Sequence, residues 1–320
     1  MSKIHRQRLY HAGHLRAVLR AVWLSVLLLS APACKTERPT PEPPAGLKPP
    51  RVAASASPIS DLLFLHPVPL TFRPLEEGLA YARLELVRSS DGSRLEAIAL
   101  RVDPARFRFR MLSAPRELGS DYGFLFELVR KSRPLAAINA SFYLKDSFEP
   151  TGLVVSSGEV LHPWTRTGGS GLFRVRGSEA RIEWARTFNP EWEQDDLAVQ
   201  SWPLLVEPGG EPGIYSNQHK RRARSAAGVD GEGRVILLCT RLVDGGDAET
   251  GGLDLYELME LLMLSPEQGG LGVPAALNLD GGTSASLWIA HPRLKLELRS
   301  KNLIRNAIAV FRKTDPPPAR

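Results

Sequence analysis

The chain has 320 residues, of which 43% are apolar and 24% are charged. This composition is that of a globular protein able to bury a full core in one large domain or two small ones. The net charge of +6 is misleading, because removing the five basic residues that precede Ala21 leaves +1. We therefore expect no general affinity for nucleic acid. Those five residues are Lys3, Arg6, Arg8, Arg16 and Arg20.

The first 33 residues have the order of an export signal. The basic start leads into an apolar run from Ala21 to Leu29, and small residues then precede Cys34. The run is far shorter than the roughly 20 apolar residues that cross a bilayer. The proline-rich stretch that follows argues against an internal hydrophobic helix. We expect residues 1–33 to be a signal peptide of an exported protein.

The two cysteines have different expected fates. Cys34 occupies the position of a lipidated cysteine, and its surroundings resemble a lipobox that departs from the usual pattern at Ala31 and Pro32. We expect lipidation of Cys34 and a membrane anchor in the cell envelope, periplasmic or outer membrane. The alternative is ordinary cleavage near Ala33 and secretion. Cys239 lies in an apolar run, which favours a buried, inert thiol.

Prolines dominate the segment after Cys34 and predict a tether over residues 34–60. The expected folded domain covers residues 61–312. The proline-rich end, residues 313–320, is expected to be a disordered tail.

Strand and helix patterns follow one another along this domain. Residues 106–111 alternate strictly between apolar and basic side chains, which indicates a half-buried strand. Residues 122–131 are expected to form a helix. Turn residues between apolar runs then predict three hairpins, within 154–161, 172–184 and 229–235.

A second helix is predicted from Asp254, which can cap it together with Glu257 three residues later. It should end before Pro266. The expected fold class is therefore α+β: a mixed, largely antiparallel sheet with hairpins and a few packing helices, in a single domain.

Common catalytic motifs for metalloproteases, P-loop enzymes and serine hydrolases are absent, and the histidines lack the spacing of metal ligands. The clearest local signal is an apolar strand that leads into Asp280, Gly281 and Gly282. Such a turn presents a carboxylate beside backbone amides that can receive an oxyanion. The same residues also suit an ordinary hairpin turn.

Two further segments carry polar residues at the ends of apolar strands. Asn139 follows one of them, and its amide can contact a sugar hydroxyl or developing negative charge, or can simply hold a loop. Glu149 stands on a rigid turn before Pro150, where an exposed turn acid is the alternative interpretation. Arg224 precedes another strand and can form a bidentate pair with phosphate, whereas Arg221 and Arg222 are expected to be a solvated charge run.

In their order and spacing these segments resemble the phosphodiester glycosidase family. The resemblance spans about residues 84–311. Its motifs here are Asn139–Tyr143, Gly152–Val155, Gln200–Leu204, Arg224–Asp230, the helix from Asp254, Asn278–Ser284 and Asn306–Phe311. Ser141 and Thr283 depart from the family pattern, because glycine is usual at both positions. Both departures affect the expected substrate more than the fold.

The resemblance implies hydrolysis of sugar-1-phosphodiesters, with a carbohydrate or sugar-phosphate substrate. We expect no cofactor and no metal site. The resemblance implies catalytic roles for Asp280 and Arg224, and we expect Glu149 to be the second carboxylate. Substrate binding falls to Asn139, Gln200, Asn278, Gly281, Gly282 and Ser284. An exopolysaccharide at the cell surface is one possible target. The alternative is a non-catalytic, glycan-binding lipoprotein, and a metal-dependent phosphodiesterase is a weaker third interpretation because grouped ligands are few.

Overall fold

The computed structural model describes residues 55–56, 59, 61–187, 194–243 and 251–315. All of them lie in the second of the two compact units into which the chain divides, Pro50–Arg320. The expected signal peptide, Cys34, most of the tether and the end of the tail lie outside the described residues. Within the described part, no helix is both long and apolar enough to traverse a bilayer.

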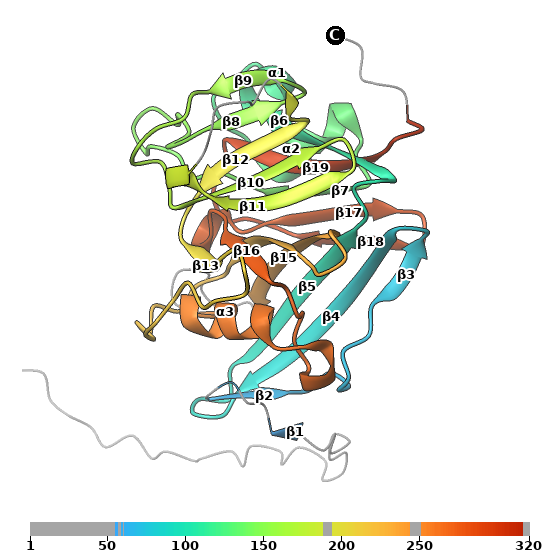
Figure 1. The fold of residues 1–320 in the computed structure, drawn as a ribbon, viewed down its shortest axis with the longest axis vertical. Coiled ribbons are helices and arrows are strands. Elements are labelled where there is room, and N and C mark those ends of the chain that lie inside the picture. Colours follow the sequence, from blue (N-terminus) through green and yellow to red (C-terminus); the bar gives the residue numbers. More distant parts are fainter. Residues whose placement is uncertain (1–54, 57–58, 60, 188–193, 244–250, 316–320) are drawn as a thin grey trace, which may run out of the picture. The chain divides into compact units, whose positions relative to one another are not determined.

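The largest sheet has nine strands (Figure 1). In spatial order it runs through β1 (Ser55–Ala56), β2 (Leu62–Phe64), β4 (Leu79–Arg88), β5 (Arg94–Val102), β15 (Val235–Leu242), β14 (Ser225–Val229), β16 (Ala275–Asn278) and β13 (Leu204–Val206), with β3 (Arg73–Glu76) also paired to β4.

Two five-stranded sheets complete the β-structure. One has the order β11 (Glu179–Trp184), β10 (Gly171–Arg176), β12 (Leu197–Ser201), β8 (Val154–Ser156) and β9 (Glu159–His162). The other has the order β18 (Leu294–Leu298), β17 (Leu287–His291), β7 (Ala136–Asn139), β19 (Asn306–Arg312) and β6 (Phe107–Ser113).

Helices are few and short. They are α1 (Ala114–Leu118), α2 (Leu125–Ser132) and α3 (Leu255–Met263), with 3-10 turns η1 (Ala185–Thr187), η3 (Pro266–Gln268) and η4 (Gly282–Ser284). Every strand pair among the described residues is antiparallel. The expectation of a largely antiparallel fold is therefore confirmed. The expected sheet was mixed, but no parallel pair occurs among the described strands. Strands also make up more of the fold, relative to helices, than the α+β class suggests.

Strand alternation divides the interior into two main apolar clusters. In β5, Ile98 and Leu100 face a core to which all three sheets contribute, while Ala97 and Ala99 face the opposite side. There they pack in a cluster with the apolar face of α3, and α3 lies beside β13 (Figure 1). The nine-stranded sheet is thus buried on both faces, which explains its continuous apolar runs.

The local sequence signals locate most elements correctly. The strand expected over 106–111 is β6, and the three hairpins are β8–β9, β10–β11 and β14–β15. Asp254 caps α3 by accepting hydrogen bonds from Tyr256 N and Glu257 N, and the Glu257 side chain accepts from Asp254 N.

The helix expected over 122–131 begins three residues late, at Leu125. Gly123 is held instead in an isolated antiparallel bridge with Ile304. At the N-terminal edge of the domain, β1 pairs with β2, and Ile59 is buried in the apolar cluster that includes α3. Packed structure therefore reaches to the N-terminal side of the expected boundary at residue 61.

Candidate active site

Antiparallel pairing brings the two strongest sequence signals together. In the register of β14 and β16, Ala226 stands opposite Asn278, so β14 begins where β16 ends. Arg224 directly precedes β14, and Asp280 lies two residues beyond β16. The hydrogen bond from Leu279 N to Ser225 O, 2.8 Å long, extends this register past the strand ends.

The ends of these strands open onto a cavity of about 560 Å³, here called the site pocket. Its lining combines charged groups from four segments that are separate in the sequence. The charged residues are Lys145, Lys220, Arg222, Arg224, Asp254 and Asp280. Four cations against two carboxylates give the pocket a net positive charge, which suits an anionic ligand.

The turn after β16 is held by its own backbone amides. Gly281 N donates to Asp280 Oδ1 at 2.9 Å, and Gly282 N donates to Ala223 O at 2.7 Å. Gly282 has a φ of 60°, a left-handed conformation that glycine adopts readily. Both glycines line the site pocket, but both amides already donate within the fold. The Gly281 amide thus fixes the Asp280 carboxylate, and the Gly282 amide fixes the turn against Ala223.

Arg224 is buried at the base of the pocket, with 7% of its surface exposed. Nε donates to Leu253 O at 2.9 Å and Nη2 donates to Lys220 O at 2.6 Å. Among the described residues Nη1 has no hydrogen-bond acceptor, so the guanidinium keeps donors for a ligand. Burial, and then the nearby charge of Arg222, lower its pKa to about 10, which leaves it charged at neutral pH.

The neighbouring arginines depart from the expected solvated run. Arg221 forms ion pairs with Asp61 at 3.4 Å and Asp91 at 3.2 Å. Arg222 lines the site pocket beside Arg224. The bridge between Arg222 and Leu253 fixes this segment against the start of α3, which turns the run into part of the pocket wall.

Two buried polar groups at the pocket lack partners among the described residues. Asp254 is 1% exposed, and its Oδ2 accepts no hydrogen bond while Oδ1 caps α3. Asn278 is 3% exposed; its Nδ2 donates to Trp202 O at 2.9 Å, and its Oδ1 is unpartnered. Buried polar groups normally have partners, so unpaired ones lining a cavity mark places for a ligand. Sequence analysis identified Asp254 only as a helix cap.

The pocket also has an aromatic wall. The rings of Phe142 and Trp202 stack with centroids 5.1 Å apart, and Trp202 is half exposed. Tyr256, in the first turn of α3, lines the pocket as well. Flat apolar surfaces beside charged groups are typical of sites that hold a sugar ring by its apolar face.

Asn139 lies next to the site but outside the pocket lining. Its Nδ2 donates to Asp280 O at 2.6 Å, and its Oδ1 accepts from Ser225 Oγ at 2.7 Å and Ser286 N at 3.0 Å. The side chain is 1% exposed. Asn139 therefore ties the ends of three strands together and fixes the main chain at Asp280.

Gln200 has a similar position away from the pocket lining. Its Oε1 accepts from Leu153 N at 3.0 Å, and its Nε2 donates to Thr165 O at 2.8 Å. A side chain at Gly152 would lie 2.6 Å from that Oε1, so glycine permits the close approach. Ser284 is also buried outside the lining, and the nearby Tyr143 hydroxyl donates to Leu303 O at 3.1 Å. Burial raises the pKa of Tyr143.

The remaining predicted positions also lie outside the pocket lining. Glu149 stands on an exposed turn. Ser141 donates through its N and Oγ to Asn306 Oδ1, at 3.0 and 3.1 Å. Thr283 Oγ1 accepts from Asn302 Nδ2 at 2.7 Å. The two residues that replace family glycines thus bind neighbouring segments of the fold.

Comparison with known proteins identifies one matching family model and several solved structures of similar fold. The family model described as phosphodiester glycosidase matches residues 132–311. This interval contains every segment that lines the site pocket. No curated protein matches the chain in sequence.

Two solved structures resemble the chain at 18% identity. A hypothetical protein from Synechocystis superposes with a TM-score of 0.52, covering 78% of this chain and 64% of its own. The second structure is the catalytic domain of zebrafish N-acetylglucosamine-1-phosphodiester alpha-N-acetylglucosaminidase, auto-inhibited by its pro-peptide. It superposes with a TM-score of 0.54, and the match covers 81% of this chain and 87% of the zebrafish domain. The chain therefore spans less than two thirds of the Synechocystis protein. At this identity the likeness establishes a common fold.

Proposed function

The chain belongs to the phosphodiester glycosidase family, and on this premise we propose that it hydrolyses sugar-1-phosphodiesters in the site pocket. Water adds to the anomeric carbon, and the bond from that carbon to the phosphate oxygen breaks. Its electron pair stays with the departing phosphate monoester, and the sugar is released with a free hydroxyl. The water's second proton passes to a carboxylate or to solvent.

One observation carries the proposal: Arg222 and Arg224, from one segment, line the same cavity as Asp280, from a distant one. A phosphodiester carries one negative charge that grows as the bond to the sugar breaks. Arg224 and Arg222 neutralise that charge with donors already fixed in the fold. Phosphate is a good leaving group, so charge neutralisation matters more here than its protonation.

Asp280 stabilises the positive charge that develops at the anomeric carbon, or activates water, as one carboxylate of a glycosidase pair. Its backbone is fixed by Asn139 and its Oδ1 by Gly281 N, so it enters the reaction already oriented. Asp254 is the second carboxylate of the pocket. It replaces Glu149 in our proposal, because Glu149 lies outside the lining.

The sugar stacks on the wall formed by Phe142 and Trp202, and the unpartnered Oδ1 of Asn278 accepts from one of its hydroxyls. In this proposal Asn139 and Gln200 support the site through the backbone instead of touching the sugar. The fold shared with the zebrafish enzyme makes N-acetylglucosamine-1-phosphodiesters the first substrates to try.

The test is release of free sugar from a panel of sugar-1-phosphodiesters by the purified mature protein. The panel varies the sugar and the anomer with the same methyl alcohol on the phosphate. Hydrolysis by the wild type and its loss in Asp280→Asn support the proposal. Tight binding of the panel without any hydrolysis would favour the glycan-binding lipoprotein instead.

We also propose export and anchoring through Cys34, because basic, apolar and small-residue segments precede it in that order. The anchor would hold the enzyme at the cell envelope, near extracellular or cell-surface polysaccharide. Labelled fatty acid should enter the wild type and be absent from Cys34→Ser. Label in both proteins, or retention in the cytoplasm, would refute the anchor.

A further inference from the structure

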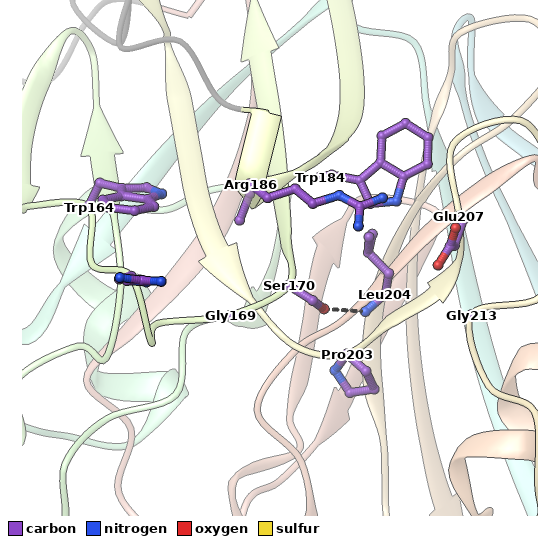
Figure 2. A pocket seen from close by; sticks show the side chains of 11 residues that line it. Trp164, Gly169, Ser170, Trp184, Arg186, Pro203, Leu204, Glu207 and Gly213 are labelled. Carbon is purple, nitrogen blue, oxygen red and sulfur yellow. Dashed lines mark hydrogen bonds between the residues drawn. The ribbon is translucent and has the colours of Figure 1, made fainter.

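A second cavity has a volume of about 630 Å³, and Figure 2 shows the residues that line it. We call it the tryptophan cleft. Pro203 lines both cavities, and the neighbours Gly213 and Ile214 line one each. The two cavities therefore meet along the same stretch of chain. The side chains that give the cleft its character are Trp164, Arg166, Trp184, Arg186 and Glu207.

One wall of the cleft pairs an indole with a guanidinium. Trp184 ends β11 and Arg186 follows in η1, with the guanidinium carbon 5.8 Å from the centroid of the indole. Figure 2 shows Arg186 extended against Trp184, with Leu204 and Glu207 nearby and Trp164 across the cleft. Trp164 is 38% exposed, so a large apolar ring faces solvent there.

The base of the cleft is built by close backbone approach. A side chain at Gly169, whose φ is 152°, would clash with the carbonyl of Ser201, and one at Gly213 would clash with that of Leu204. Ser170 Oγ accepts a 2.9 Å hydrogen bond from Leu204 N, drawn in Figure 2. These contacts fix two loops against the start of β13, so the cleft is a formed part of the fold.

One polar atom of the cleft lacks a partner. The indole nitrogen of Trp184 is buried, and no acceptor for it exists among the described residues. An unpaired buried N–H is costly, and a ligand hydroxyl or phosphate oxygen would relieve that cost. A sugar hydroxyl is therefore the type of group that the Trp184 position favours.

The cleft repeats the chemistry of the site pocket. Each cavity offers aromatic rings for a sugar face beside a pair of arginines for an anion: Phe142 and Trp202 with Arg222 and Arg224 in the pocket, Trp164 and Trp184 with Arg166 and Arg186 in the cleft. Two adjacent sites of the same kind suit a ligand in which sugar and phosphate alternate.

We propose that the tryptophan cleft binds the sugar-phosphate repeat next to the bond that is cleaved, so that the preferred substrate is a glycosyl-1-phosphate polymer. The inference rests on the proposed hydrolysis in the site pocket. The repeat's sugar packs on Trp184 and its phosphate pairs with Arg186, while Glu207 accepts from a hydroxyl. Two arginines against Glu207 leave the cleft positive, which favours this anionic repeat over a neutral glycan.

The test compares two substrates with the same reacting bond. One is an oligomer of N-acetylglucosamine-1-phosphate, and the other is the methyl diester of N-acetylglucosamine-1-phosphate, too short to reach the cleft. Trp184→Ala and Arg186→Ala should each raise KM for the oligomer about tenfold, the effect of about 1.4 kcal/mol of lost contact. KM for the methyl diester and kcat for both substrates should stay unchanged.

Arg181→Ala is the matched control, because Arg181 is an exposed arginine of β11, the strand that ends at Trp184, and lies outside the cleft. It should leave both KM values unchanged. Arg186 is exposed, so its variant reports on the cleft even if Trp184→Ala disturbs folding. If Arg186→Ala raised KM by the same factor for the oligomer and for the methyl diester, relative to the wild type, the proposal would be overturned.

Calorimetric binding of the oligomer to Asp280→Asn separates this proposal from the catalytic one. Even if the wild type hydrolyses neither substrate, the cleft proposal is supported when the double variant, Asp280→Asn with Arg186→Ala, binds the oligomer more weakly than Asp280→Asn alone. Equal binding with and without Arg186→Ala would refute it. Binding of a neutral N-acetylglucosamine oligomer as tight as that of the phosphate-linked one would also refute it.

Discussion

The side-chain amide of Asn139 donates a 2.6 Å hydrogen bond to the main-chain carbonyl of Asp280, across 141 positions of sequence. This bond joins the end of β7 in a five-stranded sheet to the turn after β16 in the nine-stranded sheet. The main chain strengthens the link, because Asp280 N donates to Ala140 O at 2.9 Å. The proposed catalytic carboxylate is thus positioned by the junction of two sheets.

Asn139→Asp should lower both stability and activity. Aspartate keeps the size of the side chain but removes the donor to Asp280 O and places a charge in a buried site. We expect the free energy of unfolding to fall by about 1–3 kcal/mol, the usual cost of an unsatisfied buried group. Denaturant titration measures it. Asn302→Asp is the control, since Asn302 is an exposed residue whose amide donates to Thr283 Oγ1, outside the pocket lining. An equal loss of stability there would contradict the account.

Gly281→Ala tests the close approach between the Asp280 turn and the start of β14. The new Cβ would lie 2.9 Å from Ala223 O, so the turn that carries Asp280 must shift. We expect kcat to fall about tenfold or more, because small displacements of a reacting group are costly. Gly231→Ala is the control, because nothing lies within 4 Å of a Cβ there. Full activity in Gly281→Ala would show that this geometry is not needed.

Arg224→Lys keeps a charge but cannot reproduce the planar fork that bonds Leu253 O and Lys220 O while facing the pocket. We expect kcat/KM for a sugar-1-phosphodiester to fall roughly a hundredfold. Arg221→Lys should change it less than about twofold, because Arg221 serves partly exposed ion pairs with acids. Initial rates decide the matter, and equal losses would indicate a diffuse basic patch.

Local sequence patterns predicted elements whose signals are short-range. The capping pair Asp254 and Glu257 located α3, and turn residues located three hairpins. The start of α2 could not be placed, because Gly123 is held by a bridge to Ile304, far away in sequence. The division into three sheets likewise depends on pairings between distant strands.

The sequence predicted which residues lie at the candidate site better than it predicted what their side chains contact. Asp280, Arg224, Asn278, Gly281 and Gly282 all line the pocket. Side-chain direction is set by tertiary contacts, and no local pattern reports it. The polar residues Asn139 and Gln200 therefore looked like ligand contacts although their amides bond the fold. For the same reason the sequence did not predict that Asp254 and Arg222 line the pocket. Asp254 was accounted for as a helix cap, and Arg222 as part of a solvated basic run.

The thiol of Cys239 should be unreactive in the folded protein. It is buried, and burial raises its pKa to about 12. Near pH 8 only about one thiol in ten thousand is then ionised, and the fraction grows only as the pH approaches 12. In a Cys34→Ser protein, iodoacetamide should label nothing at pH 8 and one site in concentrated guanidinium chloride. Rapid labelling without denaturant would contradict this burial.

The most direct measurement is the initial rate of sugar-1-phosphodiester hydrolysis by Asp280→Asn, with its thermal melt recorded beside that of the wild type. Asparagine is nearly isosteric and is accepted in tight turns, so the melt should hardly change. We predict that turnover collapses by roughly a hundredfold or more, because the carboxylate charge is lost. A folded Asp280→Asn protein with normal turnover would contradict the assignment of this pocket as the active site.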